Sequence, residues 1–396
     1  MHKIAYVTHY DAHDIRQWSG LGYYIAKSLE GAGNELHYLG NLKFDPSISF
    51  KLRHKLERIS GHKFTSLIEK SILESFGKDA TRRLPQNVDL VFSPGTLAIT
   101  YLETSLPKVI YTDSILHGLW EYYPDYCGWS TRKKLRAEEF EYKAISEAAL
   151  ICFASDWAAN AAIQHYKLDP AKVHVVPFGA NLKETPLQNV VYNSIKHRDK
   201  KQLHLLFIGV DWLRKGGPKA IAVARALKDG GIDVVLHIAG TRSNPIENQG
   251  DEKWIRYYGF LARENPKDEQ TLYELYNNSH FFIMPTFAEC YGLVFCEANA
   301  YGLPVIAQDT GGVSTVVQNG YNGLLLKVDD SEVQMSEQIK AVWETPGSYE
   351  QMANGARKQY ERLLNWGVAG KTLTAALNRF KEGGGLAINQ FIQAKL

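Results

Sequence analysis

Two glutamates in the segment 285–298 have the spacing and surroundings of a ligand site. The pattern predicts a strand ending at residue 285, a loop with Glu289, and a helix that begins near residue 292 and carries Glu297. The unpaired amides and positive dipole end of such a helix form an anion site for a diphosphate. Glu297, deeper in the helix, could then accept hydrogen bonds from two ribose hydroxyls. The amides concerned are those of Gly292, Leu293 and Val294.

A plainer interpretation of this spacing stays open. Glutamate is common at both places, so Glu289 could be an N-terminal helix acid and Glu297 a surface residue.

The motifs that follow the two glutamates resemble those of a known family. They are Gly302-Leu303-Pro304-Val305-Ile306-Ala307, then Gly311-Gly312, then Gly320-Tyr321-Asn322-Gly323. This ordered block resembles the signature of the family 4 retaining glycosyltransferases, also called glycosyl transferases group 1. The resemblance implies an α/β protein with the GT-B fold, in which two Rossmann-like, doubly wound domains face each other. It also implies a catalytic role for Glu289 and places Glu297, Phe260 and Leu261 in the donor site.

A second segment, 207–217, reads as a strand, a loop and a helix start with two adjacent cations, Arg214 and Lys215. In the family, this loop has a Gly-Arg pair, a spacer and a Lys-Gly pair, whose cations clamp the diphosphate. Lys215-Gly216 matches the second pair, and the resemblance assigns Lys215 to catalysis, but Val210 stands where the arginine usually is. We expect Arg214 to supply the missing charge, because a guanidinium fork suits phosphate. A solvated charge pair at a helix start is the alternative.

The first half of the chain carries weaker candidates. Gly20 and Gly22 follow the first expected strand and resemble the glycine loop of the family, whose backbone approaches the diphosphate and the acceptor. His117 lies beyond another strand, near where the family often has a histidine that contacts the donor sugar, so we assign it to catalysis. A hydrogen-bonded loop histidine would explain His117 equally well.

Acceptor candidates surround His117. Asp113 precedes it, and an aromatic cluster that includes Trp120 and Tyr123 follows it. Aromatic faces stack on the C–H surfaces of sugars, so the cluster could form an acceptor platform. Packing of a helical insertion is an equally good explanation.

The elements that must position these residues alternate along the chain. Short β-branched runs alternate with helix-period segments, as is typical of parallel α/β units. The expected strands are 4–8, 90–93, 109–112, 150–154 and 173–176 in the first half, and 203–209, 233–240, 281–285, 304–307 and 323–327 in the second. A polar stretch at 183–202, which ends in a charge run at 196–201, interrupts the pattern, which then resumes at residue 203. We therefore predict an acceptor-binding domain over 1–185, a linker over 186–202, a nucleotide-sugar-binding domain over 203–370 and a helical tail over 371–396 that crosses back. Ligands of doubly wound sheets bind at the carboxyl ends of the strands, so the expected active site is the cleft between the domains.

Composition excludes some classes of function. The 45 Lys and Arg nearly balance the 43 Asp and Glu, so no overall field would draw the protein to nucleic acid. We expect the four cysteines to be free thiols, and the protein to be cytoplasmic, because the chain opens on a strand and has no apolar run of roughly 20 residues. The basic, amphipathic stretch 51–59 could rest on an anionic membrane if the acceptor is a lipid; a solvated helix is the alternative.

The expected co-substrate is a nucleoside diphosphate sugar, and the acceptor is a carbohydrate, a lipid-linked molecule or a small molecule. No Asp-x-Asp motif is present, so we expect no metal and no other cofactor. We expect the helix dipole, Lys215 and Arg214 to supply the positive charge at the diphosphate. A phosphorylase or synthase, or a nucleotide-sugar epimerase, would suit the same fold. A non-enzymatic sugar-binding protein is the rival of another class.

Overall fold

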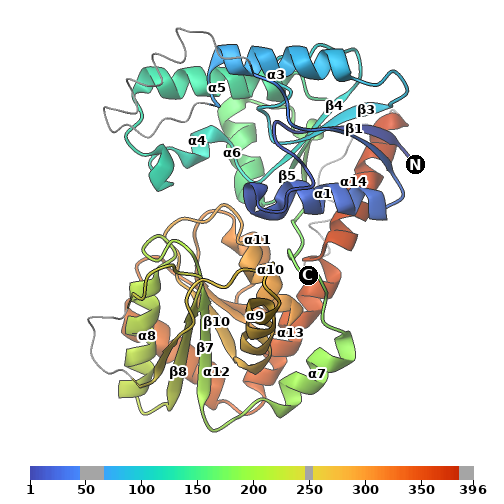
Figure 1. The fold of residues 1–396 in the computed structure, drawn as a ribbon. Helices are drawn as coiled ribbons and strands as arrows, with labels where there is room; N and C mark the ends of the chain where they lie inside the picture. The colour runs from blue at the N-terminus through green and yellow to red at the C-terminus, as the bar shows by residue number, and fades with distance from the viewer. Residues whose placement is uncertain (45–66, 246–252, 383–396) are drawn as a thin grey trace. The chain divides into compact units, whose positions relative to one another are not determined.

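The computed structural model describes residues 1–44, 67–245 and 253–382, which form two compact units. The first unit comprises Met1–Pro177 together with the chain from Trp366 onward, and the second comprises Phe178–Asn365. Each unit has one parallel six-stranded sheet with helices around it (Figure 1).

The first unit is built on a sheet of order β2-β1-β3-β4-β5-β6. Its central strands are short apolar runs buried on both faces, as parallel sheets covered by helices require. The strands are β1 (Lys3–Val7), β2 (Glu35–Leu39), β3 (Leu90–Pro94), β4 (Lys108–Thr112), β5 (Leu150–Phe153) and β6 (Val173–Val175). The main helices are α1 (Leu21–Gly31), α3 (Lys70–Arg83), α4 (Leu116–Leu119), α5 (Thr131–Ser146), α6 (Asp156–Tyr166) and α14 (Trp366–Lys381).

The helix α14 belongs to the first unit although it lies at the other end of the sequence. It packs along α1, and the Asn34 side-chain amide donates to the Thr374 hydroxyl at 2.8 Å (Figure 1). The chain therefore leaves the first unit after Pro177 and returns to it at Trp366.

The second unit has a sheet of order β12-β11-β10-β7-β8-β9. The chain adds β8 and β9 on one side of β7 and then crosses to add β10, β11 and β12 on the other side. The topological switch point thus lies between β7 and β10, which pair in parallel. The strands are β7 (Leu203–Ile208), β8 (Val234–Ala239), β9 (Ile255–Tyr257), β10 (Phe281–Met284), β11 (Val305–Gln308) and β12 (Gly323–Leu326). The helices are α7 (Gln188–His197), α8 (Gly217–Asp229), α9 (Pro266–Asn278), α10 (Leu293–Ala300), α11 (Val313–Val316), α12 (Glu332–Glu344) and α13 (Ser348–Arg362).

The segment expected to link the domains contains α7, which packs against α13 within the second unit. Arg198, within the charge run at 196–201, is buried. The Arg198 guanidinium donates to the carbonyls of Asn277, Tyr301 and Gly302 and to the hydroxyl of Tyr349. These bonds fasten the end of α7 to the unit.

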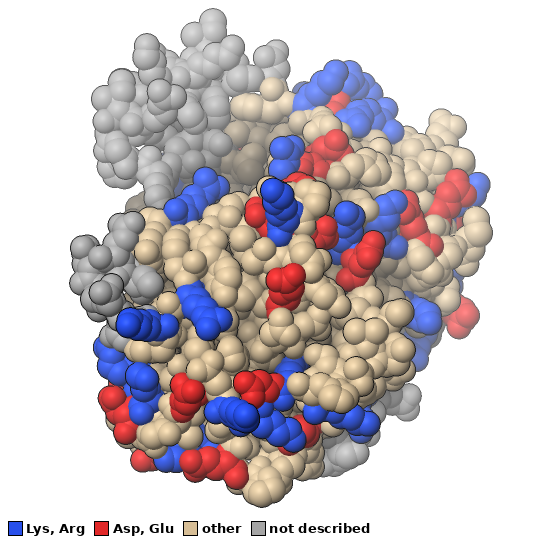
Figure 2. All heavy atoms as spheres, turned by 60° about the horizontal axis from the view of Figure 1, so that its bottom comes forward, with Lys and Arg blue, Asp and Glu red and all other residues tan. Residues whose placement is uncertain are grey.

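The surface drawn in Figure 2 carries interspersed acidic and basic side chains, in keeping with the nearly balanced charge of the chain. Within the described ranges, no helix is both long enough and apolar enough to span a bilayer. The basic stretch 51–59 lies outside the described residues.

Candidate functional site

An ion pair connects two loops at the switch point of the second sheet. Lys215 lies in the loop between β7 and α8, and its ammonium group forms an ion pair with the carboxylate of Glu289, from the loop between β10 and α10. Arg214 Nη1 donates to the carbonyl of Ala288 at 2.8 Å and lies 4.0 Å from Glu289 Oε2. The ion pair is largely withdrawn from solvent, because the Lys215 and Glu289 side chains are only 16% and 9% exposed.

The backbone of these two loops explains why the charges meet. Gly216 has a φ of +76°, and a Cβ at this position would lie 2.0 Å from the carbonyl oxygen of Pro285. Only glycine allows such a close approach of the two loops. The Phe287 amide and the Thr286 hydroxyl then both donate to the carbonyl of Arg214, at 2.9 and 3.1 Å.

The N-terminus of α10 lies in the second of these loops. Gly292 precedes the helix with a φ of +96°, and a Cβ there would lie 2.3 Å from the Phe295 ring. Leu293 and Val294 form the first turn and are partly buried. The structure therefore brings together Lys215, Arg214, Glu289 and the start of α10, at the edge of the sheet where a doubly wound fold binds ligands.

Glu297 is buried inside α10 and belongs to a polar network that sequence reasoning did not find. The Arg263 guanidinium forms an ion pair with Glu297 Oε2 and also donates to the carbonyl of Asn181 at 2.8 Å. The Tyr276 hydroxyl donates to the same Glu297 oxygen at 3.1 Å. Burial, followed by the charge of Glu297, raises the pKa of Tyr276 well above its ordinary value, so this hydroxyl stays a donor.

Phe260 and Leu261 lie in the loop between β9 and α9, the same loop that carries Arg263. The Phe260 side chain is 46% exposed, and the Arg242 guanidinium lies 5.1 Å from its ring centroid. Arg263 fastens this loop to α10 through Glu297. No motif in the sequence indicates the pairing of Arg263 with Glu297, because Arg263 lies in a loop and Glu297 lies in a helix 34 positions further along the chain.

Three of the candidates in the first unit, Gly20, Gly22 and Asp113, lie after strands of its sheet. Gly20 and Gly22 lie at the start of α1, where the Gly22 carbonyl accepts a hydrogen bond from the Tyr6 hydroxyl at 2.7 Å. Asp113 follows β4 and is partly buried, with its carboxylate 3.4 Å from the Ser114 hydroxyl.

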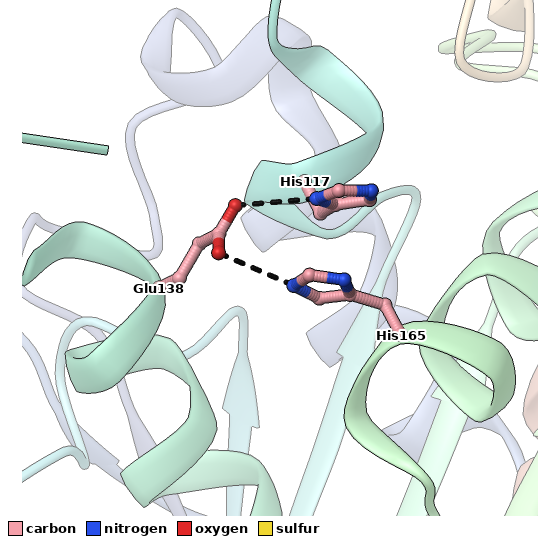
Figure 3. A group of neighbouring side chains, drawn as sticks. All are labelled: His117, Glu138 and His165. Atoms are coloured by element: carbon pink, nitrogen blue, oxygen red, sulfur yellow. Dashed lines mark hydrogen bonds and ion pairs between the residues drawn. The ribbon is translucent and has the colours of Figure 1, made fainter. Parts of the chain in front are cut away.

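His117 and Trp120 both contact Glu138, a residue of α5 that sequence reasoning missed. His117 Nδ1 lies 3.3 Å from Glu138 Oε1, and the indole N–H of Trp120 donates to the same oxygen. His165, on α6, contacts the other carboxylate oxygen at 3.2 Å (Figure 3). Tyr123 packs against Tyr122, with ring centroids 5.7 Å apart.

The second unit matches a known protein family in sequence. Residues 192–359 match the family model described as glycosyl transferases group 1. The curated relatives include D-inositol 3-phosphate glycosyltransferases of Paenarthrobacter aurescens (strain TC1) and Corynebacterium glutamicum (strain R), which are 28% and 29% identical to this chain over 197 and 213 residues. The aligned parts cover 48% of this chain in both cases, and 48% and 49% of the relatives. The chain thus spans about half the length of the curated relatives it matches.

Solved structures are similar over nearly the whole chain. Sucrose-phosphate synthase from Thermosynechococcus elongatus matches with a TM-score of 0.67 at 16% identity, covering 97% of this chain and 100% of that one. The Anabaena protein HepE, in complex with UDP and glucose, matches with a TM-score of 0.58 at 16% identity and covers 96% and 100%. The second unit of the chain is therefore similar to the glycosyl transferases group 1 family over residues 192–359, and the chain as a whole has the GT-B fold.

Proposed function

We propose that this protein transfers a sugar from a nucleoside diphosphate sugar to a hydroxyl acceptor, with retention at the anomeric carbon and without a metal ion at the diphosphate. The observation that carries the proposal is the meeting of Lys215, Arg214 and Glu289 beside the N-terminus of α10, at the switch point of the second sheet.

The cations and the helix start would bind the diphosphate. An ammonium group has three N–H donors, so Lys215 can keep its bond to Glu289 and also bond to a phosphate oxygen. The diphosphate gains charge as the glycosidic bond breaks, and donors already fixed in place stabilise that charge without reorganising. Glu289, held by Lys215, would face the sugar and accept hydrogen bonds from its hydroxyls.

Glu297 would bind the ribose. Arg263 and Tyr276 both contact Oε2 of its carboxylate, which leaves Oε1 to accept bonds from ribose hydroxyls. The phosphate that departs would take the proton of the acceptor on the same face of the sugar, which gives retention. No second carboxylate is needed as a nucleophile in this scheme.

The first experiment is a thermal-shift panel of nucleoside diphosphates and their sugars. A ligand that binds only the folded chain raises the apparent melting temperature by mass action. We expect one base to stand out, and UDP is the first to test because HepE was solved with UDP. No shift with any nucleotide would contradict the proposal.

The second experiment measures the stereochemistry of the product. NMR of the product formed from a donor of known configuration should show the same anomeric configuration in the product. An inverted product would refute retention, and phosphate-dependent cleavage of a glycoside would favour a phosphorylase on the same fold.

A further inference from the structure

Three side chains that can bind a metal converge in the first unit from separate helices. His117 is on α4, Glu138 on α5 and His165 on α6, and Figure 3 shows the Glu138 carboxylate beside the two rings, with one oxygen facing a nitrogen of each ring. One possible ligand atom from each residue lies within 4.8 Å of the other two. Neither the expected nucleotide chemistry nor the fold requires this grouping.

The distances suit a small tetrahedral ion. Zinc binds imidazole nitrogen and carboxylate oxygen at about 2.0–2.2 Å, so neighbouring ligand atoms of a tetrahedral site are about 3.3 Å apart. Each histidine nitrogen lies at about this distance from a different Glu138 oxygen: Oε1 is 3.3 Å from His117 Nδ1, and Oε2 is 3.2 Å from His165 Nε2. For one oxygen to bind the ion, the carboxylate must turn from this position. The rings are stacked with centroids 3.6 Å apart and planes 14° apart, so at least one ring must rotate for both nitrogens to face one ion.

The surroundings hold the three residues in place. The Trp120 indole N–H donates to the carboxylate of Glu138. Hydrogen bonds of this kind commonly orient carboxylates that bind metal ions. Buried Glu141 accepts hydrogen bonds from the Leu116 amide at 2.8 Å and from the Tyr166 hydroxyl at 2.6 Å. Leu116 and Tyr166 are the sequence neighbours of the two histidines, so Glu141 holds the backbone next to His117 and the side chain next to His165.

The charge and exposure of the group also favour a cation. Glu138 brings the one carboxylate of the group and is partly buried between the two histidines and Trp120. The His117 side chain is 50% exposed, which gives an ion access and leaves room for a water ligand.

We propose that His117, Glu138 and His165 bind a divalent transition-metal ion, with Zn²⁺ as the best fit and water in the fourth position. The ion would fasten α4, and the aromatic segment that follows it, to α5 and α6. His117 would then serve as a metal ligand and not as the expected contact of the donor sugar. The inference does not depend on the proposed transfer reaction.

The test uses the full chain, with any purification tag removed and metal stripped by chelation. Titration with Zn²⁺ in a calorimeter should give one equivalent bound. Titration with Co²⁺ should give the visible absorption of a tetrahedral or five-coordinate ion. His165→Gln should weaken Zn²⁺ binding by at least about tenfold, because it removes one of three protein ligands. The matched control is His197→Gln, a substitution at an exposed histidine of the second unit, and it should bind as wild type does.

Two further measurements guard against an unfolded variant. Circular dichroism should show that His165→Gln keeps the wild-type spectrum, and Zn²⁺ should raise the melting temperature of wild type but not of this variant. Trp120→Phe, which keeps all three ligands but removes the indole N–H, should weaken Zn²⁺ binding by about 10–100-fold. Equal Zn²⁺ affinity in wild type and in folded His165→Gln, or no saturable binding by wild type, would overturn the inference. Nucleotide binding measured on the same variants reports on the proposed function separately.

Discussion

At the scale of single residues, the structure gives Arg214 two contacts that bear on its role. Its guanidinium supports the loop of Glu289 through the carbonyl of Ala288, and its Nε bonds to Asp211 at 3.1 Å. Val210, at the position of the family arginine, is 62% exposed. Within this loop, Arg214 and Lys215 are therefore the two cations near Glu289, and Arg214 brings the charge that Val210 lacks.

If both cations face the diphosphate, their loss should lower turnover more than it raises the donor KM, because the leaving group gains charge in the transition state. We expect Lys215→Ala to be severely impaired and Arg214→Ala clearly but less impaired. The double variant should lose less than the sum of the two losses in free energy, since both cations act on one diphosphate. Steady-state kinetics would measure this, with Lys228→Ala, at an exposed lysine of α8, as the control. Wild-type kinetics for Lys215→Ala would exclude this loop as the phosphate site.

Glu297 offers a second test at this scale. Glu297→Ala should weaken nucleoside diphosphate binding by about 1–3 kcal/mol, the usual cost of losing hydrogen bonds to buried hydroxyls. Calorimetry would measure it, and Glu274→Ala, at an exposed glutamate of α9, is the control. The substitution also leaves the Arg263 charge unpaired, so Glu297→Gln should be compared. Unchanged affinity in both Glu297 variants would remove this residue from the site.

At the scale of elements, α5 controls the placement of its neighbours α4 and α6 through the buried Glu141. Burial raises the pKa of Glu141 from 4.5 to about 7, with a small contribution from the charge of Glu138. The unfolded chain therefore releases this proton at lower pH than the folded chain does. The stability that the protonated form provides is complete below about pH 4.5 and is lost as the pH rises toward 7.

We predict that Glu141→Gln removes this dependence, because an amide keeps an acceptor oxygen but does not ionise. Between pH 5 and 8, thermal unfolding of wild type should lose stability on the order of 3 kcal/mol more than that of the variant. Glu139→Gln, at an exposed glutamate on the same helix, should follow wild type. Parallel pH profiles for wild type and Glu141→Gln would show that this carboxyl group does not titrate as described.

Elements also show where sequence reasoning succeeds. The strands expected at 4–8, 109–112 and 281–285 correspond to β1, β4 and β10, because buried parallel strands are continuous apolar runs. The strands β2 and β9 were missed because both are partly exposed edge strands with polar residues in them: Glu35 and His37 in β2, and Arg256 in β9. The charge run at 196–201 predicts a solvated linker, yet Arg198 is buried among carbonyls that come from distant positions.

The same reasoning explains what was predicted of the site. The order of motifs predicts the glutamates and Lys215, since they lie in short stretches with strand, loop and helix signals. Partners such as Arg263, Tyr276, Glu138 and His165 were missed, because only the folded chain brings them to their neighbours. A local pattern carries no information on such pairs.

At the scale of the whole molecule, the two proposals make separate statements about metal. We expect transfer to survive prolonged treatment with EDTA, because Lys215, Arg214 and the helix dipole supply the positive charge at the diphosphate. The same treatment should lower the melting temperature if the histidine site of the first unit held an ion. Loss of turnover in EDTA that is restored by Mg²⁺ or Mn²⁺ would refute the account of the phosphate site.

The return of α14 to the first unit has a consequence for synthesis on the ribosome. The helix α1 is synthesised early, but α14, which packs on it, leaves the ribosome only after the whole of the second unit. The second unit is one uninterrupted stretch of chain and can finish folding as it leaves the exit tunnel. The first unit, by contrast, has to wait with an apolar helix face uncovered, so a stalled or truncated nascent chain that ends at Asn365 would be a substrate for chaperones and proteases.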